Sequence, residues 1–325
     1  RISDIQASNF LEQIATTNVL NDLNDCDLII EAVEDDFDTK TFALKQIGNC
    51  SKESIIATST TLLSITELGE ACGYCERIVG MHFFNPAPIT PLVEIVRGNN
   101  SSESAIQRAT LLAEAWGKTV VHCEDTSGFI VNRISQPFYL ESWRIVEEGI
   151  ATINFVDETL QTFGEFKMGP FILSDLIGQD VLAQTTVKIW NQLGKPNRLM
   201  PSERQTSLVE KGHFGRITGC GAYAHDDKKN TVPAILIETQ ELELSNRLEH
   251  AINDFCIEAT CTSGSMLEKY IFSRVLASII NEAMWVSSDE ITSSKDIDIA
   301  MKLAANYPLG PIEWANRIGM DRVLN

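Results

Sequence analysis

Two apolar stretches, DLIIEAV (27–33) and SIIATST (54–60), decide the fold of the first part of the chain, together with the amphipathic segment at about 38–47 that separates them. Short apolar runs bounded by polar residues are typical of buried strands, and the segment between them has helical spacing. Further elements follow downstream, with strands predicted at 77–84, 92–98 and 118–123 and a helix at about 101–117. Residues 1–123 are therefore expected to form most of a Rossmann-like α/β domain.

Composition excludes several classes of protein. The chain has 325 residues, of which 44% are hydrophobic and 22% charged, and this is typical of a globular protein with two or more domains. No run of about 18 apolar residues predicts a membrane span. The 26 basic and 45 acidic side chains give a net charge of −19, which repels a phosphate backbone. We therefore expect neither a nucleic-acid partner nor a membrane partner.

Eight cysteines are scattered along the chain without the spacing of a disulfide framework or a metal site. This usage is typical of a reducing compartment, so we expect a cytoplasmic protein with free thiols and no bound metal. One pair, Cys72-Gly-Tyr-Cys75, has the spacing of a redox motif. Because no second such pair or nearby histidine pair accompanies it, we interpret both as structural cysteines.

The rest of the chain is predicted to be mainly helical. Residues 124–225 form a first helical domain, in which 129–149 is the clearest helix and Asp125-Thr-Ser-Gly128 signals a helix N-terminus. Residues 226–264 are expected to be a linker or small subdomain. It begins within the polar run 224–230, has a weak strand at 234–238 and then a helix-like piece. Residues 265–325 form a second helical domain.

The second helical domain repeats the first at a shift of 141 residues, without a gap between about 129 and 182. Nine residues recur in register, and the apolar pattern is shared. The recurring residues are Ile130, Arg133, Glu141, Asp157, Gly169, Pro170, Ile177, Gly178 and Asp180. We interpret this as duplication, and expect the two copies to pack about a pseudo-twofold axis, as a monomer with an internal pseudo-dimer or as part of a homo-oligomer.

His82 and Glu94 are the strongest candidates for chemistry. His82 is placed near the end of a strand, and Glu94 follows twelve residues later on the next strand. A carboxylate on the neighbouring strand can hold one ring nitrogen and leave the other free for proton transfer. Spacing alone favours the other interpretation, a hydrogen-bonded structural histidine beside a surface glutamate. An isolated amide such as Asn132 near a helix start usually bonds the local backbone.

Five segments together resemble the 3-hydroxyacyl-CoA dehydrogenase family in order and spacing, over essentially the whole chain. They are MHFFNPAP (81–88), LVEIV (92–96), SGFIVNR (127–133), MGPFILSDLIGQD (168–180) and GRITGCGAY (215–223). The duplication resembles the long bacterial subgroup that includes 3-hydroxybutyryl-CoA and 3-hydroxyadipyl-CoA dehydrogenases. The resemblance implies an incomplete Rossmann-like dinucleotide-binding domain, with its first βαβ and glycine loop missing, followed by duplicated helical domains.

The resemblance also implies roles for individual residues. His82 corresponds to the catalytic base and Glu94 to its paired acid. Three other positions correspond to active-site amides and to an active-site serine, namely Asn85, Asn132 and Thr61. Positions that contact NAD in the family correspond to Glu34, Lys40, Ser59 and Thr61, with Lys40 needing a one-residue shift in the alignment. A solvated helix face is the alternative for Lys40.

The chain departs from the family pattern at three places. Ser59-Thr-Thr61-Leu62 stands where relatives read Asn-Thr-Ser-Ser, and Ile217 replaces a common lysine. The opening strand with its glycine-rich loop is absent from the sequence. Gly219-Cys-Gly-Ala-Tyr-Ala224 fits GxGxxA but lacks the strand–turn–helix context, so we discount it. The family's usual size predicts a natural start about 75 residues before Arg1, with the glycine-rich turn there.

The leading hypothesis is therefore NAD-dependent oxidation of L-3-hydroxyacyl-CoA to 3-oxoacyl-CoA in fatty or aromatic acid degradation, with an acyl-CoA thioester as substrate. The departures at Ser59 and Thr61 and the missing loop keep an alternative open, a catalytically impaired acyl-CoA-binding or structural homologue. A dehydrogenase of free small hydroxyacids is disfavoured by the HFFNP and GFIVNR segments. Residues 268–325 lack an α/β half of their own and have Ser273 at the position of Asn132, so we expect one active site per chain.

Overall fold

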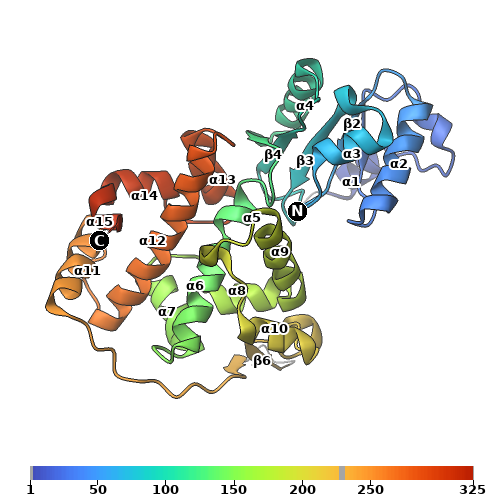
Figure 1. Cartoon of the computed structure of the whole chain (residues 1–325). Coiled ribbons are helices and arrows are strands. Elements are labelled where there is room, and N and C mark those ends of the chain that lie inside the picture. The colour runs from blue at the N-terminus through green and yellow to red at the C-terminus, as the bar shows by residue number, and fades with distance from the viewer. Residues whose placement is uncertain (1–2, 227–230, 325) are drawn as a thin grey trace.

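A computed structural model describes residues 3–226 and 231–324, and it divides into an α/β part and a helical part (Figure 1). The α/β part contains the N-terminal elements, and the helical part contains everything from α5 to the C-terminus. Helix α5 lies where the two parts meet (Figure 1). The predicted combination of fold classes, a Rossmann-like sheet followed by helical repeats, is confirmed.

A five-stranded sheet forms the centre of the α/β part, in the order of the chain. Its strands are β1 (Leu28–Glu31), β2 (Ile55–Thr58), β3 (Ile78–Phe83), β4 (Leu92–Arg97) and β5 (Thr119–Glu124). The first three are mutually parallel, β4 is antiparallel to β3, and β5 is parallel to β4. All four residues of β2 are buried, which explains its unbroken apolar run. In the antiparallel pair, His82 lies directly opposite Glu94.

The helices of the α/β part begin at the polar residues that the sequence supplies for this purpose. They are α1 (Asp4–Leu11), α2 (Phe37–Cys50), α3 (Ile65–Cys72) and α4 (Glu103–Ala115), with the 3-10 turns η1 (Leu20–Leu23) and η2 (Cys75–Arg77). The side chains of Asp36, Ser64 and Ser102 each accept a backbone N–H three residues later. These N-caps satisfy donors that a helix start leaves free.

The helical part comprises two sets of helices joined by an extended segment. The first set is α5 (Val131–Ile134), α6 (Gln136–Glu147), α7 (Ile153–Thr162), α8 (Pro170–Ile177), α9 (Gln179–Gln192) and α10 (Glu203–Glu210), with 3-10 turns η3 (Asn197–Leu199) and η4 (Arg216–Thr218) and a hairpin of β6 (Tyr223–His225) and β7 (Thr231–Pro233). The second set is α11 (Asn246–Glu258), α12 (Met266–Ser288), α13 (Ser294–Leu303), α14 (Pro311–Ile318) and α15 (Met320–Leu324). Among the described residues, no helix combines the length and apolarity that crossing a bilayer requires.

Three local predictions were wrong. The expected single helix over 129–149 is divided at Ser135 into α5 and α6, and Pro137 stands in the first turn of α6, where a proline is tolerated. Asp125 does not cap the helix that follows it; its carboxylate instead accepts N–H groups at the start of α3, at 3.1 and 2.8 Å. No strand forms at 234–238, and β7 lies just before it, paired with β6. Of the polar run 224–230, residues 227–230 lie outside the described residues.

The two helical copies pack on each other with reciprocal contacts, and α12 lies along α6 (Figure 1). Arg133 of the first copy donates to Glu282 of the second at 2.7 Å, while Arg274 of the second donates to Glu141 of the first at 2.9 Å. The shift of 141 residues relates Arg133 to Arg274 and Glu141 to Glu282. Because each patch meets its own counterpart, this is the arrangement of a twofold interface, and the predicted pseudo-twofold packing is confirmed.

The repeated Gly-Pro has a steric cause in both copies. Asp157 accepts the N–H groups of Phe171 and Ile172 at the start of α8, and Asp298 does the same for α14. A Cβ at Gly169 would lie 2.4 Å from the Asp157 side chain, and one at Gly310 would lie 2.2 Å from the Asp298 side chain. Only glycine leaves room for the capping carboxylate, so the glycine and the aspartate recur together.

Candidate active site

The centre of the site is a hydrogen-bonded pair across two antiparallel strands. His82 Nδ1 and Glu94 Oε2 are 2.5 Å apart. Residues directly opposite in an antiparallel pair have Cβ atoms about 5 Å apart, so the twelve-residue spacing brings the two side chains together through the β3–β4 register. Glu94 is fully buried and His82 is 6% exposed. The structure therefore excludes the reading of Glu94 as a surface residue.

Glu94 is held on its other oxygen by the start of the helical part. Its Oε1 accepts the N–H groups of Ile130 and Val131, at 3.2 and 3.0 Å. Helix α5 has no side-chain cap of its own, so Glu94 satisfies the N–H groups that a helix start leaves free. The carboxylate thus has hydrogen-bond partners on both of its oxygens. Burial and the nearby Glu94 charge raise the pKa of the Cys123 thiol on the adjacent strand β5.

The orientation of the imidazole follows from these contacts. A carboxylate only accepts hydrogen bonds, so Nδ1 of His82 donates to Glu94. In the neutral ring, this leaves the lone pair on Nε2. The ring packs edge-on against Phe84, with centroids 4.6 Å apart, and is tilted against Phe129 at 5.6 Å. Phe129 has a left-handed backbone, with φ of 48°. The arrangement presents a neutral, oriented base with restricted access to water.

The other residues predicted for the catalytic site differ in solvent exposure. Asn132 and Thr61 are half-buried, and Asn85 is exposed. Asn132 is the second residue of α5, next to the Val131 N–H that binds Glu94. Its backbone carbonyl accepts from Gln136, while its amide makes no hydrogen bond to another described side chain. The structure therefore leaves the Asn132 amide available to a ligand.

Lys40, predicted as a cofactor contact or a solvated residue, is neither solvated nor free. It is 1% exposed, and its ammonium donates to Glu31 Oε1 at 2.9 Å and to the carbonyl of Val33 at 3.1 Å. Glu31 is buried too, and its other oxygen accepts from Thr58 at 2.7 Å. This buried ion pair ties α2 to the ends of β1 and β2. Sequence reasoning missed Glu31, which reads as one more residue of a strand.

Glu34, predicted as a cofactor contact, differs in its surroundings from the acidic residue that follows it. It is exposed, while its neighbour Asp35 accepts the hydroxyl of Thr60 at 2.6 Å and lies 3.9 Å from the Lys40 ammonium. The turn after β1 places Asp35 beside the loop that follows β2, where Ser59 and Thr61 are half-buried. The carboxylate available at the ends of the parallel strands is therefore Asp35. The one-residue shift that Lys40 needed in the comparison with the family was the signal that could have pointed to Asp35 in place of Glu34.

Several polar groups lie together at this edge. Ligands of open α/β sheets bind at the carboxyl ends of the strands, and here those ends bring together Asp35, Ser59, Thr60 and Thr61. These polar groups fit a ribose or an amide. A pyrophosphate needs a glycine-rich turn between a strand and a helix, and none of the glycines in the described α/β part lies in such a turn. The described residues therefore fit one end of NAD and do not supply its pyrophosphate cradle.

The GxGxxA segment was rightly discounted. Gly219 ends the 3-10 turn η4, and Tyr223 begins β6 of a small hairpin, so no helix follows the glycines. The side chain of Asp175 accepts the N–H groups of Ala222 and Tyr223, both at 2.9 Å, and pairs with His225 at 2.8 Å. The segment is thus held against Asp175 of α8, and it lacks the strand–turn–helix context of a dinucleotide loop.

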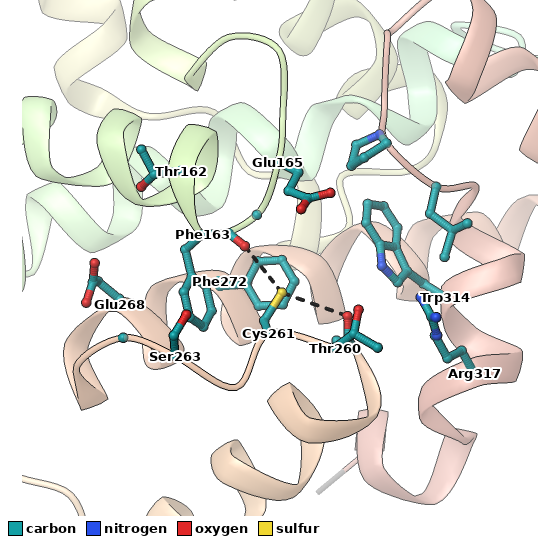
Figure 2. Close-up of a pocket in the computed structure, with 15 residues that line it drawn as sticks. Thr162, Phe163, Glu165, Thr260, Cys261, Ser263, Glu268, Phe272, Trp314 and Arg317 are labelled. Atoms are coloured by element: carbon teal, nitrogen blue, oxygen red, sulfur yellow. Dashed lines mark hydrogen bonds between the residues drawn. The ribbon is translucent and has the colours of Figure 1, made fainter.

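A separate cavity of about 490 Å³ lies between the two helical copies and the turn before α12 (Figure 2). The ring centroids of Phe163 and Phe272 are 5.3 Å apart, and Cys261 Sγ donates to the carbonyl of Phe163 at 3.3 Å. Burial raises the pKa of the Cys261 thiol to about 11, so it stays protonated at neutral pH. None of the predicted site residues lines this cavity.

Other cysteines behave as structural residues. All eight are free, and Cys72 is buried with its Sγ bonded to the carbonyl of Gly69 at 3.4 Å. Burial raises the pKa of the Cys72 thiol, which makes it a poor nucleophile. Within the described residues, no group of three or more His, Cys, Asp or Glu side chains has the geometry to hold a metal ion.

Family models match both parts of the chain. Residues 1–126 match the NAD binding domain of 3-hydroxyacyl-CoA dehydrogenase, and residues 128–225 and 270–325 match the C-terminal domain of 3-hydroxyacyl-CoA dehydrogenase. The C-terminal match covers both helical copies, in agreement with the internal repeat.

Relatives and solved structures agree with the family models. The 3-hydroxyadipyl-CoA dehydrogenase of Escherichia coli K12 is 31% identical, over 97% of this chain and 78% of that protein. The 3-hydroxybutyryl-CoA dehydrogenase of Mycobacterium tuberculosis H37Rv is 34% identical, over 69% of this chain and 79% of that protein. The crystal structure of 3-hydroxybutyryl-CoA dehydrogenase from E. coli K12 superposes with a TM-score of 0.84, at 27% identity, over 99% of this chain and 81% of that one.

Proposed function

The chain belongs to the 3-hydroxyacyl-CoA dehydrogenase family, and from that premise we propose that it oxidises L-3-hydroxyacyl-CoA thioesters to 3-oxoacyl-CoA with NAD, in the degradation of fatty or aromatic acids. The observation that carries the proposal is the buried His82–Glu94 pair, with His82 Nε2 free of protein partners in the inferred tautomer. It lies between the sheet and α5, where the two parts of the molecule meet.

His82 acts as the general base. Oxidation of a secondary alcohol removes a hydride from C3 and a proton from the hydroxyl, and NAD supplies the hydride acceptor when bound. His82 Nε2 takes the hydroxyl proton, so the C3–O bond becomes a carbonyl and the imidazole becomes imidazolium. In the reverse direction the imidazolium returns the same proton to the oxygen.

Glu94 prepares and stabilises that base. Its hydrogen bond to Nδ1 fixes the tautomer that leaves Nε2 unprotonated, and its charge stabilises the imidazolium formed in the reaction. The N–H groups of Ile130 and Val131 keep the carboxylate in place.

Substrate oxygen is bound by the amide of Asn132, with the hydroxyl of Thr61 as its second donor. The Asn132 amide has no partner among the described side chains, which is expected of a group reserved for a ligand. Asn85 and Ser59 take supporting roles toward substrate and cofactor respectively. Asp35 replaces Glu34 as the acidic group beside the cofactor, and Lys40 orients it through the ion pair with Glu31.

One active site forms in each chain, in a monomer with an internal pseudo-dimer. The second copy has Ser273 at the position of Asn132 and no sheet of its own. Its role is to cover the apolar face of the first copy, as the partner subunit of a dimer would. The eight free cysteines support a reducing, cytoplasmic location.

The test is turnover of acetoacetyl-CoA and NADH by the full natural gene product and its His82→Ala variant. We expect NADH consumption by the parent protein and a fall in kcat of at least ~10²-fold in the variant, with thioester binding retained. Glu94→Gln should reduce kcat in the same direction, because an amide cannot stabilise imidazolium by charge. Parent-like turnover in His82→Ala would overturn the mechanism.

The alternative of an impaired homologue predicts a different outcome. The methyl group of Thr61, where relatives have serine, is the feature that favours it. An inactive parent protein that binds acyl-CoA and gains turnover in Thr61→Ser would support that alternative. Retained or slightly raised turnover in Thr61→Ser, from an active parent, supports the dehydrogenase.

A further inference from the structure

The interface between the helical copies contains two equivalent clusters of charge, related by the shift of 141 residues. In the first, Arg133 donates to Glu282 at 2.7 Å and to Asp289 at 3.3 Å. In the second, Arg274 donates to Glu141 at 2.9 Å and to Glu148 at 2.6 Å.

The two clusters differ in burial. Arg133 and Glu282 have side-chain exposures of 2% and 0%, against 21% and 11% for Arg274 and Glu141. A second arginine, Arg198, also donates to Glu282 at 2.6 Å. Charges removed from water this completely depend on their partners to stay in place.

Only the first cluster connects to the site. Arg133 belongs to α5, a helix of four residues, and follows Val131 and Asn132 directly. The Val131 N–H holds Glu94, and Glu94 holds His82. Arg274 lies within the continuous helix α12, where the N–H groups of the equivalent residues are used by the helix itself.

We propose that Glu282 and Asp289, from the second helical copy, are positioning residues for the His82–Glu94 pair. This inference rests on the proposed function of that pair. Because α5 is too short to hold itself rigid, the Arg133 guanidinium anchors it to the second copy and so sets where the Ile130 and Val131 N–H groups point. The second helical copy thereby influences the reaction without contacting the substrate.

The decisive comparison is Glu282→Gln against Glu141→Gln, its counterpart in the other cluster. Each variant keeps the size of the side chain and removes one interface charge. The first readout is the NMR signal of the His82 Nδ1 proton in the chain described here, which needs neither cofactor nor substrate and is assigned with His82→Ala. The second is hydrogen exchange at the Ile130 and Val131 amides.

We expect Glu282→Gln to broaden or shift the His82 Nδ1 signal and to speed exchange of both amides at least ~10-fold, while Glu141→Gln leaves them as in the parent. In the full gene product, kcat should fall ~10-fold or more in Glu282→Gln with KM little changed, because a small displacement of a catalytic group is costly. Identical behaviour of the two variants would overturn the proposal.

A milder pair of variants guards against misfolding. Asp289→Asn and Glu148→Gln alter the outer carboxylates of the two clusters, which are 45% and 48% exposed. If Glu282→Gln fails to fold, Asp289→Asn should still disturb the His82 signal and Glu148→Gln should not. No disturbance in Asp289→Asn would then overturn the proposal. A disturbed signal with normal turnover would contradict the proposed function and not the anchoring.

Discussion

The two helical copies begin differently, although their sequences and their interface are equivalent. The second copy opens with one continuous helix, α12, of 23 residues. The first copy opens with a turn at Ser127–Ile130, the short helix α5 and then α6. Positions Gly128 and Phe129 have positive φ, whereas Lys269 and Tyr270 at the matching positions lie inside α12.

This difference gives the start of the first copy a feature that the second copy lacks. In a continuous helix, every interior N–H is bonded to a carbonyl four residues earlier. The delayed helix start in the first copy leaves the N–H groups of Ile130 and Val131 unused, and Glu94 from the sheet accepts both. Gly128 permits the turn, because a Cβ there would lie 2.6 Å from Ile189. The delayed helix start, and not the surrounding helices, therefore distinguishes the first copy from the second.

The largest expected difference between the copies concerns their capping aspartates. Burial raises the pKa of Asp157 to about 7, although the hydrogen bonds from the N–H of Phe171 and the hydroxyl of Tyr223 lower that pKa. Because the pKa of an unfolded aspartate is about 3.9, the native state binds a proton that the unfolded chain releases. The resulting stabilisation, up to about 4 kcal/mol, is complete below about pH 4 and is lost as pH rises through about 7.

Urea unfolding at pH 5 and pH 8 checks this expectation. Asp157→Asn should reduce the loss of unfolding free energy between the two pH values. Asp298→Asn should reduce it less, because Asp298 is more exposed, at 8% against 2%, although burial raises its pKa too. An unchanged pH dependence in Asp157→Asn would show that Asp157 is ionised throughout this range.

A proline exchange sharpens the comparison of helix starts. Ser278 is the counterpart of Pro137, and it lies in the interior of α12. Ser278→Pro should lower the free energy of unfolding by about 3 kcal/mol or more, because it removes a helical hydrogen bond and clashes with the preceding turn. Pro137→Ser should cost less than about 1 kcal/mol, since Pro137 stands near the start of α6.

Thermal and urea unfolding of both variants measures these effects, and hydrogen exchange at Ile130 and Val131 follows the break itself. We expect the division between α5 and α6 at Ser135 to persist in Pro137→Ser, because α5 is fixed by tertiary contacts that do not involve the proline, Glu94 at its start and Glu282 at Arg133. Fusion of α5 and α6 in that variant would mean that the proline, and not the tertiary contacts, divides the helix.

The smallest effect concerns the residue pair that separates an active copy from an inactive one. Asn132→Ala should lower kcat of the full gene product ~10²-fold, as removal of one polarising donor does. Ser273→Ala should leave kcat unchanged, because Ser273 donates only to the carbonyl of Tyr270 in its own helix. Steady-state kinetics checks both, and a fall in kcat in Ser273→Ala would point to a contribution from the second copy.

Much of the architecture was predictable from local patterns. The strands around Ile29, Ile56 and Ile95 were found because buried strands are short apolar runs between polar residues. The duplication was found because a twofold interface needs the same arginine and glutamate from both copies. The failures occur where a side chain acts far from its place in the chain. Asp125 has the sequence of an N-cap for the helix after it, yet it caps α3, whose cap residue Ser64 lies 61 residues earlier.

The site shows the same division. Sequence by itself determined which residues are available: a histidine and a glutamate twelve residues apart on neighbouring strands, and an amide beside an arginine in a repeated helix. The tertiary structure alone decided that Glu94 is the cap of α5, that Asp35 accepts the hydroxyl of Thr60 while Glu34 is exposed, and that Lys40 is buried against Glu31. The physical reason is that burial and hydrogen-bond partners depend on which elements pack together. A carboxylate buried with three donors and one exposed to water have the same letter in the sequence but different chemistry.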